Sequence, residues 1–276
     1  MELQTASIPR LSVILHARPQ IADLVGMALP TIGTISRKAE TERAVASVLR
    51  ELNGVFDPIG TELIVVDAES PEGIADHLKA VFSEECSRRR LQIVTCPASF
   101  DAARLRNLAA QKAQGAWLSF LSPGECFQSG RLTRLDPLLK GYHLILGLNA
   151  PSVPARADWI SSFLSNQIPP TQLVPGAALI HRSLFEEVGG YLEGRYALLI
   201  DYDLWLRALL RLRETGRLER FLLVPTQGIE PSTREARQPW IREGQEVLTV
   251  LSTLPKIPLR FWPTALKRAA SYLLNR

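Results

Sequence analysis

Cysteine is scarce in this 276-residue sequence, and the three that occur, Cys86, Cys96 and Cys126, show no C-x-x-C spacing. An odd number of scattered cysteines argues against a disulfide framework and gives no zinc-site pattern, so we expect a reducing compartment. No apolar run approaches the roughly 20 residues that span a bilayer, and residues 1–10 lack the pattern of a signal peptide. These absences predict a cytoplasmic protein.

A large excess of one charge is also missing. The 32 Lys and Arg against 28 Asp and Glu give a net charge of +4, which is too small to indicate a nucleic-acid partner. The nearest basic run, Arg88 to Arg90, is typical of a solvated helix end. With 46% hydrophobic and 22% charged residues, the composition is that of a folded globular protein.

Short apolar runs alternate with helical patterns in the first half. The run at 62–67 is typical of a strand buried on both faces of a parallel sheet. Further strands are expected at 91–94 and 116–121. Helices are expected at 38–52, at 101–113, and from Ser70, as the N-cap, to Phe82. This alternation predicts an α/β fold, a mixed and mostly parallel Rossmann-like sheet flanked by helices, whose ligands bind at the carboxyl ends of the strands.

The first strand has two candidates, 11–15 and 31–35. We prefer 11–15, because Pro30 would remove a ladder hydrogen bond if the later strand extended back. Residues 19–37 are then an insertion.

The second half is less regular. Strands are expected at 143–148, 176–180 and 221–224, helices at 183–188 and 201–213, and a loop at 226–239. Gly189 and Gly190 end the shorter helix, and the longer one has so little polar surface that we expect it to be largely buried.

Several of these segments carry motifs in a fixed order. They read Leu-Ser-Val-Ile-Leu at 11–15, Glu-Leu-Ile-Val-Val-Asp-Ala-Glu-Ser at 62–70, Ala-Arg-Leu-Arg-Asn at 103–107, Ala-Gln-Gly-Ala-Trp-Leu-Ser-Phe-Leu at 113–121, Gly-Ala-Ala-Leu-Ile-His-Arg-Ser at 176–183, Val-Gly-Gly-Tyr at 188–191 and Asp-Tyr-Asp-Leu-Trp-Leu-Arg at 201–207. In this order, over residues 10–215, the chain resembles the family 2 glycosyltransferases. The resemblance implies the GT-A fold and a nucleotide-sugar donor bound by the first half.

The resemblance also implies a D-x-D motif, and here the chain departs from the family. In its place stand Ser122, Pro123 and Gly124, followed by Glu125, the one carboxylate left. Family members hold Mn²⁺ or Mg²⁺ there against the donor diphosphate. Glu125 is either a metal ligand or a solvated loop acid, and we expect a metal to be weakly bound or dispensable.

Asp201 occupies the place of the family's general base, with Ile200 where a Glu would precede it. Such a carboxylate takes a proton from an acceptor hydroxyl; the alternative is a helix N-cap. Asp67 can accept a hydrogen bond from a nucleobase or cap its own loop. Arg106 can reach the donor diphosphate or face solvent. Ala17 and Arg18, after the preferred first strand, and Ser122 complete the expected donor site, while His181 reads as a structural histidine.

The sequence thus predicts an inverting glycosyltransferase that moves one sugar from a nucleotide-sugar to a hydroxyl of a glycan or lipid-linked acceptor. The alternative is a catalytically silent protein that binds a nucleotide-sugar or a partner enzyme. We expect a domain at 1–225, divided into a donor half at 10–125 and an acceptor half at 126–225, and a helical extension at 226–276. Apolar residues on one side of a helix after Pro263 predict either peripheral membrane contact through 259–276 or docking of this helix on the protein's own core.

Overall fold

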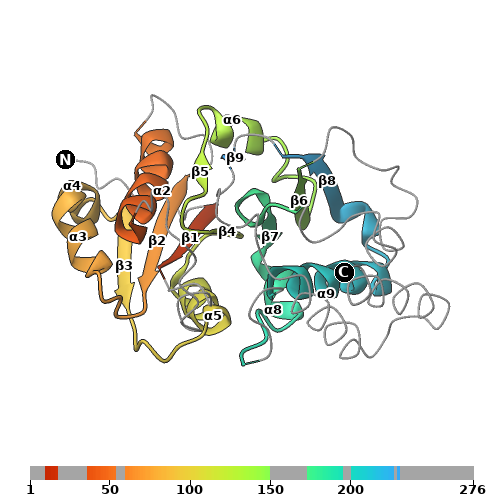
Figure 1. The fold of residues 1–276 in the computed structure, drawn as a ribbon. Helices are drawn as coiled ribbons and strands as arrows, with labels where there is room; N and C mark the ends of the chain where they lie inside the picture. The colour runs from red at the N-terminus through yellow and green to blue at the C-terminus, as the bar shows by residue number, and fades with distance from the viewer. Residues whose placement is uncertain are drawn as a thin grey trace, which may run out of the picture.

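A seven-stranded mixed sheet forms the centre of the protein, in the order β3-β2-β1-β4-β7-β6-β8 (Figure 1). The computed structural model describes residues 10–17, 36–53, 60–149, 173–194, 200–226 and 229–230. The seven strands are β1 (Leu11–Ala17), β2 (Thr61–Asp67), β3 (Leu91–Thr95), β4 (Trp117–Leu121), β6 (Leu144–Leu148), β7 (Leu179–His181) and β8 (Phe221–Pro225). A separate antiparallel pair joins β5 (Cys126–Phe127) to β9 (Ile229–Glu230).

Strand direction decides where a ligand can bind. The strands β1 to β4 are mutually parallel, and β6 is parallel to β8, while β7 runs antiparallel to both β4 and β6. All strands except β7 therefore end at one edge of the sheet. The loops that follow β1, β2 and β4 lie at that edge, which is where α/β folds bind their ligands.

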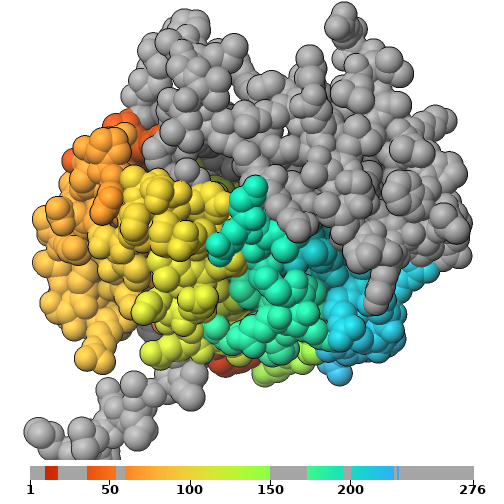
Figure 2. All heavy atoms as spheres, turned by 90° about the horizontal axis from the view of Figure 1, so that it is seen from below, coloured from red at the N-terminus to blue at the C-terminus, as the bar shows by residue number. Residues whose placement is uncertain are grey.

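Helices cover both faces of the sheet. One face packs against α2 (Arg37–Leu52), α3 (Ile74–Val81) and α6 (Arg131–Leu135), and the other packs against α5 (Ala102–Lys112), α8 (Arg182–Glu187) and α9 (Ile200–Glu214). The short α4 (Ser83–Ser87) follows α3, and 3₁₀ turns occur at Pro175–Ala177 and Leu218–Arg220. From below, the yellow segment that includes α5 adjoins the teal segment that carries α8 (Figure 2). The strands of the expected donor half, β1 to β4, and those of the expected acceptor half, β6 to β8, thus share one sheet.

The predicted α/β fold with a mixed, mostly parallel sheet is confirmed, and 11–15 does begin the sheet as part of β1. The rival strand at 31–35 and the region 231–276 lie outside the described residues. Among the described residues, no helix combines the length and the apolarity that crossing a bilayer requires.

Three local predictions are wrong. Helix α3 begins at Ile74 rather than after Ser70, because residues 70–73 form a turn that ends at Gly73 with a φ of 63°. The strand expected at 176–180 is β7 at 179–181, because a 3₁₀ turn at 175–177 takes up the first residues of the expected segment. The expected loop at 226–239 contains β9, which pairs with β5.

Candidate active site

At Asp201, helix α5 meets two segments that lie far from it in the sequence, the turn at Tyr191 and the start of α9. Arg106 Nη1, on α5, donates a hydrogen bond of 2.7 Å to Asp201 Oδ1. The Tyr191 hydroxyl donates to the same oxygen at 2.8 Å. Asp201 Oδ2 makes no hydrogen bond to any residue that the structure describes, and the side chain is 14% exposed. One carboxylate oxygen is therefore held in place, and the other remains able to accept a proton.

The turn that carries Tyr191 is fixed by Asn107, the residue after Arg106. The Asn107 side-chain amide donates to the Tyr191 carbonyl at 2.9 Å, and its Oδ1 accepts the Tyr191 N–H at 2.9 Å. Gly190 has a φ of 64°, and a Cβ there would lie 2.8 Å from Asn107 Oδ1. A glycine is thus required for both the backbone conformation and the close approach of α5.

Helix α9 supports the same turn from its other side. The Arg207 guanidinium donates to the carbonyls of Val188 and Gly190 at 2.6 and 2.8 Å, and it forms an ion pair of 2.6 Å with Asp203. Asp203 therefore stabilises the turn. Helix α9 begins at Ile200, so Asp201 lies in the first turn and is not the N-cap residue.

The charges around Asp201 are mostly buried. Arg106 is 3% exposed. Burial is the largest single influence and lowers its pKa, but Asp201, Tyr191 and Glu125 together outweigh it, so the net pKa is raised. The guanidinium lies 5.1 Å from the centroid of the Tyr191 ring. Burial and then the Asp201 charge raise the pKa of Tyr191 well above its ordinary value, so its hydroxyl stays protonated and acts as a donor. Asp201 thus faces two hydrogen-bond donors, the Arg106 guanidinium and the protonated Tyr191 hydroxyl.

Asp67 lies at the end of β2 and is 2% exposed. Its Oδ1 accepts the Ser70 N–H at 3.1 Å, and its Oδ2 accepts the Ser70 hydroxyl at 3.1 Å and the Ala75 N–H at 2.9 Å. This geometry supports the loop-capping alternative. Ala17 ends β1 and is buried, and Arg18 lies outside the described residues.

The loop after β4 directs its one carboxylate inward. Glu125 is 0% exposed. Its Oε2 accepts the Ser122 N–H at 2.6 Å, and its Oε1 accepts the Gly176 N–H at 3.1 Å. It is thus no solvated loop acid.

The buried Arg131 lies beside this loop. It is 2% exposed, and it donates to the Gly176 carbonyl at 2.9 Å. Burial, aided by Arg134, lowers the pKa of Arg131 to about 9, against the opposing effect of Glu125. The Glu125 charge is also the smallest of the influences that raise the pKa of Arg106.

The oxygen atoms that this loop offers as ligands do not fit a divalent metal. Mn²⁺ and Mg²⁺ require accessible oxygen ligands, preferably carboxylates, whereas both Glu125 oxygens accept backbone hydrogen bonds in the protein interior. Ser122 and Gly124 supply no charge. No group of three His, Cys, Asp or Glu side chains suited to a metal occurs in the described part of the chain.

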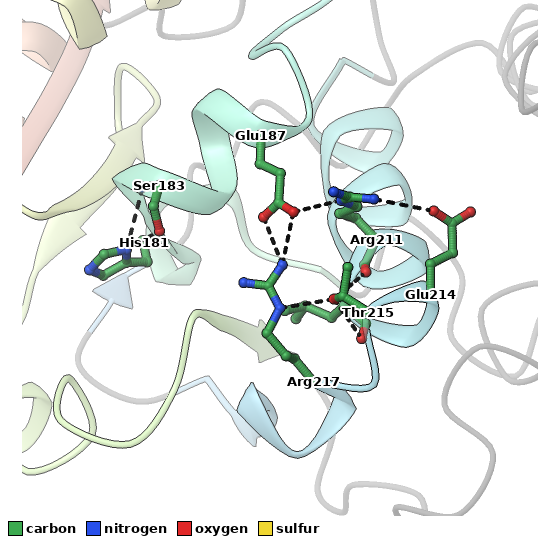
Figure 3. Close-up of polar contacts among 8 residues, drawn as sticks. His181, Ser183, Glu187, Arg211, Glu214, Thr215 and Arg217 are labelled. Carbon is green, nitrogen blue, oxygen red and sulfur yellow. Dashed lines mark hydrogen bonds and ion pairs between the residues drawn. The ribbon is translucent and has the colours of Figure 1, made fainter.

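Glu187 joins α8 to the end of α9 (Figure 3). Its carboxylate forms ion pairs of 2.6 Å with Arg211 and 2.7 Å with Arg217, and hydrogen bonding from Arg217 lowers the pKa of Glu187. His181 Nδ1 lies 2.8 Å from the Ser183 hydroxyl and accepts the Ser183 N–H, so it caps α8. That position agrees with a structural histidine.

The structure brings Asp201 and Arg106 into contact and places Glu125 within electrostatic reach of Arg106. The Asp67 side chain instead bonds to Ser70 in its own loop and to Ala75 in the first turn of α3. Sequence reasoning missed the partners Tyr191 and Arg131, and also Arg43, which donates from α2 to the Gly124 carbonyl at 3.2 Å. The motif at 188–191 included Tyr191 but gave no reason to assign its hydroxyl a role.

Comparison with known proteins agrees with this architecture. Residues 32–147 match the family model described as glycosyl transferase family 2, which confirms the resemblance to that family. A search of curated protein sequences gives no match.

Solved glycosyltransferase structures align with nearly the whole chain. The mannosyltransferase PcManGT from Pyrobaculum calidifontis, solved with GDP-Man and Mn²⁺, is 16% identical, with a TM-score of 0.62 over 97% of this chain and 70% of that one. S. aureus TarS is 13% identical, with a TM-score of 0.59 over 96% of this chain and 43% of its own. Glucosyl-3-phosphoglycerate synthase from Mycobacterium tuberculosis is 14% identical, with a TM-score of 0.53 over 95% of this chain and 80% of that one. At these identities the likeness shows the fold, which is that of the GT-A glycosyltransferases.

Proposed function

We propose that this protein transfers a single hexose from a nucleotide-sugar donor to a hydroxyl acceptor, with inversion at the anomeric carbon. The observation that carries the proposal is the arrangement at Asp201, where Arg106 and Tyr191 hold Oδ1. The family match over residues 32–147 supports the reaction class. Solved neighbours bound to GDP-Man and to UDP-GlcNAc support a nucleoside diphosphate sugar as the donor class.

In the proposed reaction, Asp201 Oδ2 accepts the proton of the acceptor hydroxyl while the hydroxyl oxygen attacks the anomeric carbon. The bond from that carbon to the diphosphate oxygen breaks, and the nucleoside diphosphate leaves from the opposite face. Attack from one face and departure from the other invert the configuration. Arg106 and the Tyr191 hydroxyl orient the carboxylate throughout, so that the base is in position before the acceptor arrives.

The donor is assigned to the loops at the carboxyl ends of β1, β2 and β4, with Ala17, Arg18, Asp67 and Ser122 as the expected lining. Asp67 can contribute through the shape of the loop that its hydrogen bonds fix. Arg106 is the least suited of the predicted donor residues to reach a diphosphate, because its guanidinium is buried and paired with Asp201.

A panel of α-linked UDP- and GDP-hexoses tests the proposal. Transfer to a sugar acceptor, or slow donor hydrolysis, is expected with at least one of them, and NMR of the first product should show the β-anomer. A first-formed α-product would contradict inversion. Nucleotide binding without any turnover would instead favour the catalytically silent alternative.

The proposed acceptor is a glycan or a lipid-linked glycan in polysaccharide biosynthesis, reached at the cytoplasmic face of a membrane through residues 259–276. This segment lies outside the described residues. Co-sedimentation with liposomes that contain anionic lipid should fall when residues 259–276 are deleted. Binding that is indifferent to both the lipid charge and the deletion would count against membrane contact.

A further inference from the structure

The loop after β4 needs a source of positive charge if a nucleoside diphosphate binds there. A diphosphate carries at least two negative charges, and in the family a metal ion offsets them. In this chain the only carboxylate of the loop is buried, and it accepts the backbone N–H groups of Ser122 and Gly176. Whatever offsets the diphosphate charge must therefore come from another element.

The sequence suggested Arg106 for this purpose, and the structure argues against it. Arg106 is 3% exposed, and its Nη1 donates to Asp201 at 2.7 Å. Arg131 is also buried, and it lies next to Glu125 with its Nη2 on the Gly176 carbonyl. Both guanidinium groups are already used to balance carboxylates in the interior.

Arg43 differs from these two arginines. Its side chain is exposed, it extends from α2, and its Nη2 donates to the Gly124 carbonyl at 3.2 Å. The hydrogen bond fixes the guanidinium against the segment that replaces D-x-D. A guanidinium has five N–H donors, and no other hydrogen bond joins this one to a described residue, so several donors remain for a phosphate.

The position of α2 brings Arg43 to the ligand-binding edge. Ser47, one turn after Arg43, accepts the Phe127 N–H at 2.9 Å, so this face of α2 lies along the β4–β5 connection. Gly124 follows β4 at the edge where β1 and β2 also end. Arginine binds phosphate oxygens in a bidentate manner without help from a metal.

We propose that Arg43 binds the diphosphate of the donor and supplies, from α2, the positive charge that a divalent metal supplies in relatives with a D-x-D motif. This inference rests on the proposed function, since it assigns a residue to its donor. It requires that donor binding be independent of Mn²⁺ and Mg²⁺.

The test is calorimetric titration of the full chain with UDP and GDP, with EDTA and with added Mn²⁺. Four proteins are compared: wild type, Arg43→Gln, Arg43→Lys and Arg50→Gln. Arg50 is the matched control because it is an exposed arginine in the last turn of the same helix. Thermal denaturation confirms that each variant is folded.

We expect wild-type affinity for the preferred nucleotide to be unchanged by EDTA. Arg43→Gln should weaken binding by about 10- to 100-fold, the range for a hydrogen bond between charged groups. Arg43→Lys should recover much of this loss, and Arg50→Gln should match wild type. Wild-type affinity should also fall more steeply with salt than that of Arg43→Gln.

Equal affinity of wild type and Arg43→Gln would overturn the inference and leave the proposed function intact. If EDTA abolishes nucleotide binding by wild type and Mn²⁺ restores it, the inference is also overturned, and the proposed function is left intact. Failure of wild type to bind either nucleotide under all these conditions would overturn the proposed function together with the inference.

Discussion

Glu125 and Asp201 are two carboxylates that each influence a buried arginine, Arg131 and Arg106 respectively, and their surroundings differ. Glu125, after β4, is inaccessible, and both of its oxygens accept backbone hydrogen bonds. Asp201, on α9, is 14% exposed and is held through Oδ1 alone. The same functional group therefore stabilises the fold in one region and remains able to accept a proton in the other. The difference between the two carboxylates lies in their hydrogen bonds. Both Glu125 oxygens accept one from the described residues, whereas only one Asp201 oxygen does.

Replacing Glu125 should have the largest effect on stability. Glu125→Ala leaves the Ser122 and Gly176 N–H groups without their acceptor and removes the charge beside Arg131, which should lower the free energy of unfolding by about 3–5 kcal/mol. Urea denaturation measures this loss. Glu186→Ala, at an exposed position on α8, is the control and should have little effect. Similar midpoints for the two variants would show that Glu125 is not a buried structural charge.

Arg106→Met should cost about 2–3 kcal/mol, less than loss of Glu125, because Asp201 is partly exposed and keeps the Tyr191 hydrogen bond. The double variant with Asp201→Asn should recover part of this loss, since it removes both members of the pair. Denaturation of the two single variants and the double variant gives the coupling energy. Strict additivity would mean that the pair contributes nothing to the fold.

The sequence predicted the strands well because each is a local pattern of buried apolar residues bounded by a polar loop. It named Asp201 and Arg106 as site residues, but it did not predict their contact. The two residues are 95 positions apart, and no local pattern encodes which carboxylate a buried arginine meets. The Ser70 cap was misplaced for a similar reason, since Asp67 on the preceding strand accepts the N–H of Ala75.

Gly190→Ala should cost about 1–3 kcal/mol, because it places a Cβ 2.8 Å from Asn107 Oδ1 at a φ of 64°. Gly189→Ala is the matched control: its φ is 79°, but no atom lies within 4 Å of the added Cβ. Denaturation should show that Gly190→Ala loses more stability than Gly189→Ala. If the free energy of unfolding falls by the same amount in both variants, the close contact between Asn107 on α5 and the Tyr191 turn does not contribute to stability.

The smallest expected effect is a pH dependence of the free energy of unfolding, which comes from two histidines. His143 and His181 stack with centroids 5.1 Å apart. Burial lowers the pKa of both, with Arg217 adding to the effect at His143, and His143 itself adding to it at His181. The unfolded chain protonates these rings near pH 6.5, whereas the folded protein does so only at lower pH. The free energy of unfolding should therefore fall as the pH is lowered below about 6.5.

His143→Phe keeps a ring at this position and removes one titrating group. Urea denaturation at pH 7.5 and 5.5 should show a smaller loss of stability on acidification for this variant than for wild type. An identical loss in both proteins would mean that the histidine pair does not contribute to the pH dependence.

The most direct test of the contrast between the two carboxylates compares Asp201→Asn with Glu125→Gln for sugar transfer per folded molecule, with nucleotide affinity measured alongside. Asn keeps the size of Asp201 and an oxygen for Arg106 and Tyr191, but it is not a base, so turnover should fall by about 100-fold or more while nucleotide affinity persists. Glu125→Gln should unfold more easily, yet the molecules that remain folded should turn over within a few fold of wild type. Near wild-type turnover in Asp201→Asn, with the rate lost in Glu125→Gln instead, would contradict the account.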